Sequence, residues 1–284
     1  AASIVACATN PATGKKPLML MSEAQEIAMG KEADQQAVAA YGLYPDERTQ
    51  AYVAGLGQQV AKASERPSLP WSFKVVDDAS VNPFALPGGY IYVTRGIMAH
   101  LRTEAELAAV LGHEIGHVTG RHSAAQMSKQ QLAMGGLMVG MIVQPELQRF
   151  GAIAQQGLGL LFLKFGRDDE NQADELGLRY MTREEYDPRE MLEVFGVLDR
   201  VTSASGGGRM PDWLSTHPSP GNRVTHIEGL IAKTGATGTV VKRDAYVRHL
   251  DGMVFGENPR EGFFKGTAFY HPDLRFQLTF PRGF

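Results

Sequence analysis

The chain has almost no cysteine, and this limits the chemistry that it can perform. Cys7 is the single cysteine among 284 residues. An internal disulfide, a redox pair of thiols and a thiolate-rich metal site are therefore excluded. If the protein binds a metal ion, histidine and carboxylate side chains must hold it.

Two further features are scarce, namely an excess of charge of one sign and long apolar runs. The chain has 28 Lys and Arg residues against 31 Asp and Glu residues, so we expect no nucleic-acid partner. The longest apolar runs, 132–143 and 158–165, are shorter than the roughly 20 residues that a membrane-spanning helix needs. We interpret the apolar region 127–165 as buried or cleft-covering helices, with contact to a membrane as the less favoured alternative.

The length and the hydrophobic fraction of 43% allow one large domain with a small appendage. We divide the chain into an N-terminal segment and linker at 1–20, a main domain at 21–235 and a C-terminal extension at 236–284. Short β-like runs in the extension are typical of the start of a further region.

The N-terminal segment contains Ile4-Val5-Ala6-Cys7, which is typical of the end of a bacterial lipoprotein signal. A lipid on Cys7 would place the protein in the periplasm or elsewhere in the cell envelope, on a membrane tether. A chance run of small residues is the alternative that the sequence leaves open.

The most informative stretch is His113-Glu114-Ile115-Gly116-His117, within a helix expected from about 103 to 118. His113 and His117 lie one helical turn apart, so both imidazoles can reach one metal ion. Glu114 projects from the edge of the same face, where it can act as a general base on a water molecule beside the metal.

The ends and faces of this helix support a metal site over a surface helix with two solvated histidines. Thr103 and Glu106 form a T-x-x-E capping box at its start. An apolar stripe turns away from the histidines; it consists of Leu107, Leu111, Ile115 and Val118.

A hydrolytic zinc site typically has three protein ligands, so a third must be found. His122 is one residue too early for the H-E-x-x-H-x-x-G-x-x-H pattern, and we interpret it as structural. Glu170 and Asp174 share one face of a helix expected at 168–181, together with the small residues Ala173 and Gly177. Glu170 is the better candidate ligand, and Asp174 can accept a hydrogen bond from the outer nitrogen of a ligating histidine.

The sequence also predicts two strands, 71–76 and 89–94, joined by a loop at 82–89. An exposed strand edge beside the metal helix can bind an extended peptide as an added strand. An ordinary hairpin connection is the alternative. Further helices are expected at 22–40, 46–63, 188–202 and 219–233.

These motifs together resemble the HtpX-like and CAAX-prenyl-protease-like family of HExxH zinc endopeptidases, in its BepA-like periplasmic branch. The similarity extends from about Met21 to Lys233. It includes the HExxH stretch, Glu170-x-x-Ala173-Asp174 and two further matches, which are Ala85-Leu86-Pro87-Gly88-Gly89 and Thr216-His217-Pro218-Ser219 followed by Arg223.

The resemblance implies a fold and a set of site residues. The expected fold is α+β and mainly α, a zincin-like (gluzincin) metallopeptidase domain with a small antiparallel sheet beside the HExxH helix. One zinc ion would be bound by His113, His117 and Glu170. Glu114 would activate water, Asp174 would support a ligand, and His217 and Arg223 would face the cleft as catalytic groups. The expected substrate-binding residues are Asn82, Phe84, Ala85, Tyr90 and Tyr92.

His217 keeps three interpretations at this stage. It can stabilise the oxyanion, a role that Arg223 can also fill. It can be a loop residue before a capped helix. By the resemblance, it can also approach the zinc and displace water in a self-inhibited resting state.

The expected function is zinc-dependent hydrolysis of peptide bonds in extended or misfolded envelope proteins, a protein quality-control activity on polypeptide substrates. One alternative is a non-proteolytic, zinc-containing, chaperone-like envelope factor that binds unfolded clients through 127–165. A zinc hydrolase with a small non-peptide substrate is another, and it would need a deep closed pocket. The oligomeric state is left open.

Overall fold

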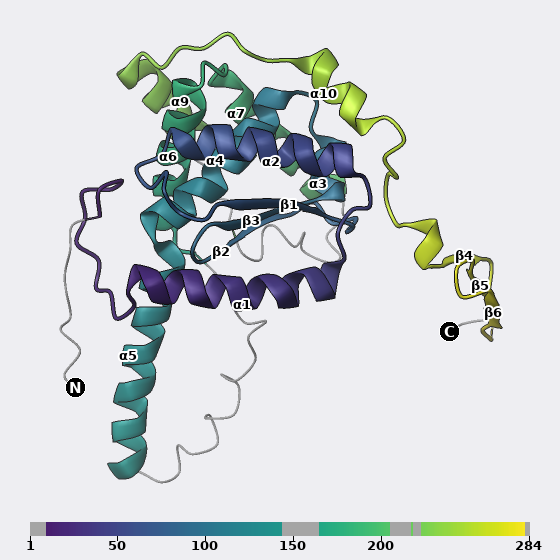
Figure 1. Cartoon of the computed structure of the whole chain (residues 1–284), viewed down its shortest axis with the longest axis horizontal. Coiled ribbons are helices and arrows are strands. Elements are labelled where there is room, and N and C mark those ends of the chain that lie inside the picture. The colour runs from purple at the N-terminus through teal and green to yellow at the C-terminus, as the bar shows by residue number, and fades with distance from the viewer. Residues whose placement is uncertain (1–9, 144–164, 205–216, 218–222, 282–284) are drawn as a thin grey trace.

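A computed structural model describes residues 10–143, 165–204, 217 and 223–281. These residues form a mainly helical body around a three-stranded sheet, with a second small sheet near the C-terminus (Figure 1). The body contains α1 (Glu23–Tyr41), α2 (Glu47–Lys62), β1 (Ser72–Val76), β2 (Pro83–Leu86), β3 (Tyr90–Thr94), α3 (Arg95–His100), α4 (Glu104–Gly120), α5 (His122–Val143), α6 (Arg167–Arg183), α7 (Arg189–Ala204), α9 (Arg223–Thr234) and α10 (Arg243–Leu250). The expected α+β, mainly helical class is confirmed.

The expected helix starts are also found where the sequence provides caps. Ser22 and Gln25 form the capping box of α1, and the Asp46 side chain accepts a hydrogen bond from Arg48 N at the start of α2. Thr103 caps α4 by accepting from Glu106 N. The helix expected at 219–233 is described from Arg223 onward, as α9.

The sheet of the body is mixed, which corrects the expectation of an antiparallel sheet. Its strand order is β1-β3-β2. β2 and β3 form an antiparallel hairpin, whereas β1 runs parallel to β3, with Ser72 beside Tyr90 and Val76 beside Thr94. The chain reverses direction twice between β1 and β3 because β2 lies between them in the sequence, so β1 and β3 point the same way.

Part of the loop expected at 82–89 is therefore the edge strand β2. Pro83 is its first residue, a position where proline is tolerated in an edge strand. The turn that follows needs glycine, since Gly88 and Gly89 have φ values of 80° and 103°. A Cβ atom on Gly88 would also lie 2.6 Å from the Cα of Ile27 in α1.

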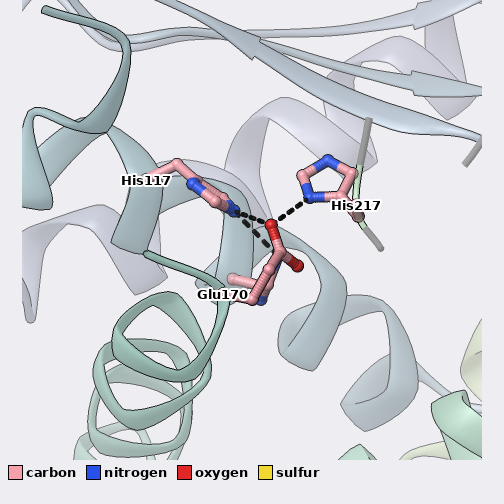
Figure 2. Close-up of side chains that lie close together, drawn as sticks. His117, Glu170 and His217 are labelled. Atoms are coloured by element: carbon pink, nitrogen blue, oxygen red, sulfur yellow. Dashed lines mark hydrogen bonds and ion pairs between the residues drawn. The ribbon is translucent and has the colours of Figure 1, made fainter. Parts of the chain in front are cut away.

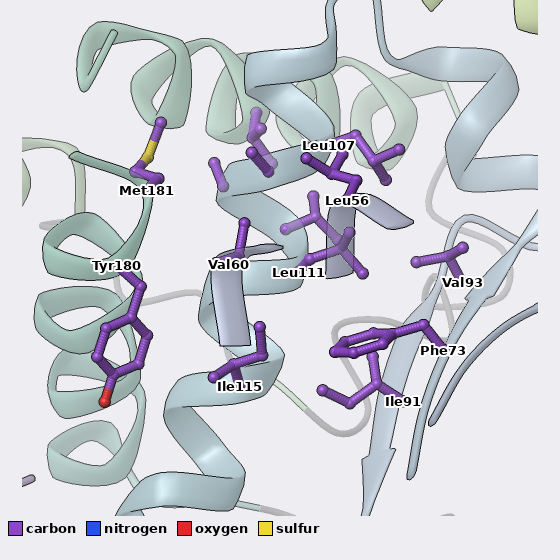
Figure 3. Packing of buried hydrophobic residues seen from close by; sticks show 14 of the residues in the cluster. Leu56, Val60, Phe73, Ile91, Val93, Leu107, Leu111, Ile115, Tyr180 and Met181 are labelled. Atoms are coloured by element: carbon purple, nitrogen blue, oxygen red, sulfur yellow. The ribbon is translucent and has the colours of Figure 1, made fainter. Parts of the chain in front are cut away.

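Helix α1 covers one face of this sheet, and α2 and α4 cover the other (Figure 1). Beneath α1 lies a small apolar cluster of Ala33, Ala37, Val76, Phe84, Leu86 and Tyr92. The main core lies on the opposite face, where α2 and α4 meet the sheet and α6 packs against α4 (Figure 3). Its residues include Leu56, Val60, Phe73, Ile91, Leu107, Leu111, Ile115 and Met181.

Helix α4 lies at the centre of the body, and every one of its residues is buried. It approaches α6 closely because small residues face each other across the contact. A Cβ atom on Gly116 would lie 2.7 Å from Ala173 O, and one on Gly177 would lie 2.8 Å from His113 N. The expectation that Ala173 and Gly177 admit the histidine helix is confirmed.

Residues on both sides of the main domain also contact the body. Near the N-terminus, Asn10 Nδ2 donates a hydrogen bond to Thr119 O at 2.9 Å. Beyond residue 235, Tyr246 is fully buried and donates to Met98 O at 2.7 Å, and Lys242 pairs with Glu104 at 2.7 Å. The division at 235 and 236 stays a prediction.

The second sheet follows the body in the sequence and lies to one side of it (Figure 1). It is an antiparallel meander of β4 (Phe263–Lys265), β5 (Ala268–His271) and β6 (Phe276–Thr279), preceded by the short 3-10 helix η3 (Pro259–Glu261). Among the described residues no helix combines the length and apolar character that crossing a bilayer requires. Cys7 and most of the apolar region 127–165 lie outside the described residues or have no described side chains.

Candidate metal centre

Helix α4 presents its two histidines to α6. The side chains of His113 and His117 are only 6% and 2% exposed, and their rings meet edge to face with centroids 4.7 Å apart. Their Nε2 atoms face each other at 3.0 Å. The spacing of one helical turn therefore gives the expected convergence of two imidazole nitrogens.

Glu170 of α6 closes around the same point (Figure 2). Its carboxylate oxygens lie 3.7 Å from His113 Nε2 and 3.5 Å from His117 Nε2, and the residue is fully buried. His217 lies on the other side of this carboxylate, with its Nδ1 atom 3.0 Å from Glu170 Oε1. One donor atom from each of these four residues lies within 4.8 Å of the others.

Asp174 orients His113, as the sequence suggested. Its Oδ1 atom lies 2.8 Å from His113 Nδ1. A carboxylate oxygen accepts, so the hydrogen is on Nδ1, and the lone pair of His113 Nε2 points to the cluster. Arg223 of α9 holds Asp174 from behind through a 2.7 Å hydrogen bond from Nε. Its guanidinium also stacks on the Phe195 ring, 4.6 Å from the ring centre.

Glu114 is 1% exposed and lies at the edge of the cluster. Its Oε1 atom is 3.8 Å from His217 Nε2 and accepts no hydrogen bond from the described residues. Burial raises the pKa of Glu114. A buried carboxylate with an unoccupied lone pair and a raised pKa has the properties of a general base.

The other ionisable groups balance burial against their neighbours. Burial opposes ionisation of Glu170, but His217, His113 and Arg223 together outweigh it and lower the pKa of Glu170. Burial would also raise the pKa of Asp174, but its neighbours, Arg223 above all, lower this pKa to about 2. Burial lowers the pKa of His117, whereas Glu170 and Glu114 raise that of His217 against the effect of burial.

These residues fit a divalent metal ion. Two imidazole nitrogens at 3.0 Å and a carboxylate oxygen, Glu170 Oε2, that accepts no hydrogen bond from the described residues all point to one place. Lone pairs so close to each other repel unless a cation lies between them. Neutral imidazole and carboxylate are also the donor set of hydrolytic zinc sites.

The expected substrate-binding residues are divided between the two faces of the sheet. Phe84, Tyr90 and Tyr92 contact the α1 side, and the Tyr92 hydroxyl donates to Asp34 of α1. The structure therefore does not bring these three side chains to the metal cluster, because alternate residues of a strand face opposite sides. Ala85 lies on the opposite face, beside the main core.

Asn82 directly precedes β2 and is 8% exposed. Its N–H donates to Thr94 Oγ1 at 3.2 Å, and its carbonyl accepts from Thr94 N. Its Oδ1 atom has no hydrogen-bond partner among the described residues.

Sequence reasoning assigned no site role to Phe165 and His122, which contact His117, or to Gln172, which contacts His122. Phe165 stacks on the His117 ring with centroids 4.1 Å apart. His122 Nδ1 lies 2.9 Å from His117 Nδ1, and Gln172 Oε1 lies 2.8 Å from His122 Nε2. Phe165 gives no signal within an apolar run, whereas a histidine following HExxH was visible and was set aside only as a metal ligand.

Comparison with known proteins identifies the family to which the chain belongs. The sequence model of Peptidase family M48 matches residues 47–231, more than half of the chain. Mitochondrial metalloendopeptidase OMA1 of Arabidopsis thaliana is 36% identical over 160 residues, which are 56% of this chain and 31% of that protein. Beta-barrel assembly-enhancing proteases of Yersinia pestis and Escherichia coli K12 are 30% and 28% identical, each over 76% of this chain and 46% of the relative. These relatives are named as a metalloendopeptidase and as proteases.

The chain belongs to peptidase family M48. It spans less than half of the length of these curated relatives. The expected relationship to a family of HExxH endopeptidases is confirmed.

Proposed function

We propose that this protein is a zinc-dependent endopeptidase of the gluzincin type that hydrolyses peptide bonds in extended or misfolded polypeptides. The observation that carries the proposal is the buried convergence of His113, His117 and Glu170 beside the Glu114 carboxylate. In this assignment one zinc ion per chain is held by the two Nε2 atoms and the Glu170 carboxylate.

The catalytic work of the chain itself falls to Glu114. When bound, zinc supplies a Lewis acid that lowers the pKa of a water ligand towards about 7 and polarises a carbonyl group. Glu114 takes the proton of the attacking water and returns it to the leaving amine. The raised pKa of Glu114 lies closer to neutral pH, which suits a group that must both accept and donate a proton.

His217 is the proposed donor to the oxyanion, because its Nε2 atom lies on the Glu114 side of the cluster. Arg223 has a different environment, since its guanidinium is held by Asp174 and lies 3.4 Å from Glu170. We therefore assign to Arg223 the orientation of Asp174 and Glu170.

The substrate would bind along β2. This strand is an edge of the sheet, and in the described part of the chain only its β3 side is paired. An extended polypeptide can add to such an edge by main-chain hydrogen bonds. Asn82 and Ala85 lie along this path. Phe84, Tyr90 and Tyr92 would act indirectly, by fixing the strand from beneath.

A pocket beside the metal centre indicates that the substrate has an apolar residue next to the scissile bond. It lies between β2, α4 and α7 and is bordered by His113 and Arg223. Its apolar lining is Pro83, Ile97, Ala109, Val110, Met191, Val194, Phe195 and Leu198. Misfolded chains expose such apolar residues, which supports a role in protein quality control.

The cellular setting is part of the proposal. Two of the relatives are named beta-barrel assembly-enhancing proteases, which supports a role in the cell envelope. A lipid tether through Cys7 would keep the protein at a membrane surface in the periplasm.

Replacing the base tests the proposal. Glu114→Gln removes the proton acceptor and keeps the shape, so we expect digestion of casein to fall by at least about 10²-fold while one zinc ion per chain remains. The wild-type digestion should stop on addition of a chelator and return on addition of zinc. Zinc-loaded wild-type protein that binds unfolded casein without cutting it would instead identify a non-proteolytic envelope factor.

A further inference from the structure

His117 contacts His122, which in turn contacts Gln172. The proposed catalytic mechanism gives no role to these two contacts. His117 must offer the lone pair of Nε2 to the metal, which requires the hydrogen of its neutral ring to be on Nδ1. For His113 a carboxylate, Asp174, enforces this choice. Among the described residues no carboxylate lies at His117 Nδ1; instead this atom faces Nδ1 of His122 at 2.9 Å.

The direction of each hydrogen bond follows from Gln172, the residue farthest from the metal centre. Gln172 presents Oε1 to His122 Nε2 at 2.8 Å, and an amide oxygen only accepts, so His122 carries its hydrogen on Nε2. A neutral ring with its hydrogen on Nε2 has its lone pair on Nδ1, the atom that faces His117 at 2.9 Å. His117 must then donate from Nδ1, which leaves its Nε2 lone pair free for the metal.

We propose that His122 and Gln172 are positioning residues that fix the tautomer and ring orientation of His117 for zinc binding. The proposal rests on the zinc centre proposed above. A neutral acceptor suits this side of the site, because Glu114, Glu170 and Asp174 already supply three buried carboxyl groups. A further carboxylate at His117 would add buried negative charge.

The backbone is shaped to hold His122 in this place. Arg121 ends α4 in the left-handed conformation, with φ 58° and ψ 33°, and α5 begins directly after it. This turn folds the His122 ring back over the last turn of α4. A Cβ atom on Gly120 would lie 2.4 Å from His122 Nε2, so the ring occupies the space that any side chain there would need.

We call the hydrogen-bonded series His117–His122–Gln172 the relay. Variants separate its effect on zinc binding from a general effect on folding. His122→Phe keeps an aromatic ring but removes the acceptor, and we expect zinc affinity to fall about 10–100-fold. Residue 172 is half-buried and contacts His122, not His117, so Gln172→Glu keeps an acceptor without adding a buried charge at His117 and should remain within about threefold of wild type. Gln172→Met should lose about tenfold. His271→Phe, in the distant β5, is the control for the histidine replacement and should leave zinc affinity unchanged.

Gly120→Ala gives an independent test through the backbone. The added methyl displaces the His122 ring, so zinc affinity should fall about tenfold or more. The matched control is Gly55→Ala in α2, where a Cβ atom meets nothing within 4 Å and zinc affinity should not change.

The closing experiment combines zinc affinity, measured by chelator competition, with NMR of the zinc-loaded full chain labelled with ¹⁵N-histidine. We expect a scalar coupling between the two Nδ1 atoms of His117 and His122, with the shared hydrogen on His117. A folded His122→Phe protein with wild-type zinc affinity, or a hydrogen on His122 Nδ1, would overturn the relay. If His122→Phe does not fold, equal zinc affinity in the two Gln172 variants would overturn it. A wild-type chain that binds no zinc would overturn the metal centre itself, and the relay with it.

Discussion

Buried acids and imidazoles control each other's charge throughout the metal centre. His217 and Arg223 keep Glu170 and Asp174 ionised although both carboxylates are buried. His117 is kept neutral, because burial lowers its pKa. Ionised carboxylates and neutral imidazole form the charge state that a divalent cation binds. At the scale of single residues, the side chains of the centre therefore have the charge state that suits a divalent cation without one being bound.

His217 is the residue whose role a single replacement decides. His217→Ala should lower kcat for peptide hydrolysis about 10²–10³-fold, because an oxyanion donor is lost. It should retain one zinc ion per chain, since His113, His117 and Glu170 remain. The measurement is steady-state kinetics together with metal analysis. A rise in kcat would identify His217 as an inhibitory contact, and loss of zinc would identify it as a ligand.

At the scale of elements, the decisive contact is that of α4 with α6. The two helices bring together residues that are far apart in the sequence, and small residues at Gly112, Gly116, Ala173 and Gly177 permit their close approach. The face of α4 that meets α6 therefore carries Gly112 and Gly116 beside the candidate ligands His113 and His117. The distance between the helices also sets the distance between the histidines and Glu170.

Gly116→Ala tests this dependence. The new methyl would lie 2.7 Å from Ala173 O, so the helices must separate, and we expect a loss of about 1–3 kcal/mol in the free energy of unfolding. Zinc affinity should fall as well. Gly229→Ala in α9, where nothing lies within 4 Å, should instead stabilise the protein by up to about 1 kcal/mol. Urea denaturation compares the two variants, and equal effects would contradict a close α4–α6 contact.

The sequence predicted these elements unevenly, for physical reasons. Caps such as Thr103 and the helical spacing of His113 and His117 are local signals, and such signals predicted most of the long helices. The short helices α3 and α10 were not predicted, and β-like runs were expected where α10 lies. The parallel pairing of β1 with β3 depends on contacts between segments apart in the sequence, and β2 was hidden by its leading Pro83. Glu170 was proposed as a ligand from the small residues on its helical face and from the resemblance. The contact between His117 and His122 depends on ring orientations that the spacing of residues does not encode.

At the scale of the whole molecule, Glu104 at the start of α4 joins segments distant in the chain. Its carboxylate accepts hydrogen bonds from Tyr52 of α2 at 2.8 Å, from Tyr186 after α6 at 2.6 Å and from Lys242 before α10 at 2.7 Å. It also lies at the N-terminus of α4, where the helix dipole favours a negative charge. The extension beyond residue 235 is thereby tied to the helix that carries the histidines.

This junction predicts a pH dependence of stability. Burial alone would raise the pKa of Glu104, but its hydrogen bonds from Lys242, Tyr186 and Tyr52 lower it below the usual 4.5. Its contribution is therefore fully present above about pH 4.5 and is lost as the pH falls through the lower pKa of the folded state. Glu104→Gln should lose about 1–3 kcal/mol at pH 7, and the difference from wild type should shrink in acid.

Urea denaturation of wild type and Glu104→Gln between pH 7 and pH 3 measures this difference. Glu47→Gln, which replaces an exposed acid in the first turn of α2, is the matched control and should differ little from wild type at any pH. A gap between Glu104→Gln and wild type that is independent of pH would contradict the junction.

The central claim is that two imidazoles of α4 and one carboxylate of α6 hold a single zinc ion. Diffraction from crystals of the zinc-loaded protein, recorded at the zinc absorption edge, tests it most directly. We expect one anomalous peak per chain, about 2.0–2.2 Å from His113 Nε2, His117 Nε2 and a Glu170 oxygen. A peak elsewhere, or a zinc ion at the histidines with Glu170 turned away, would contradict the account.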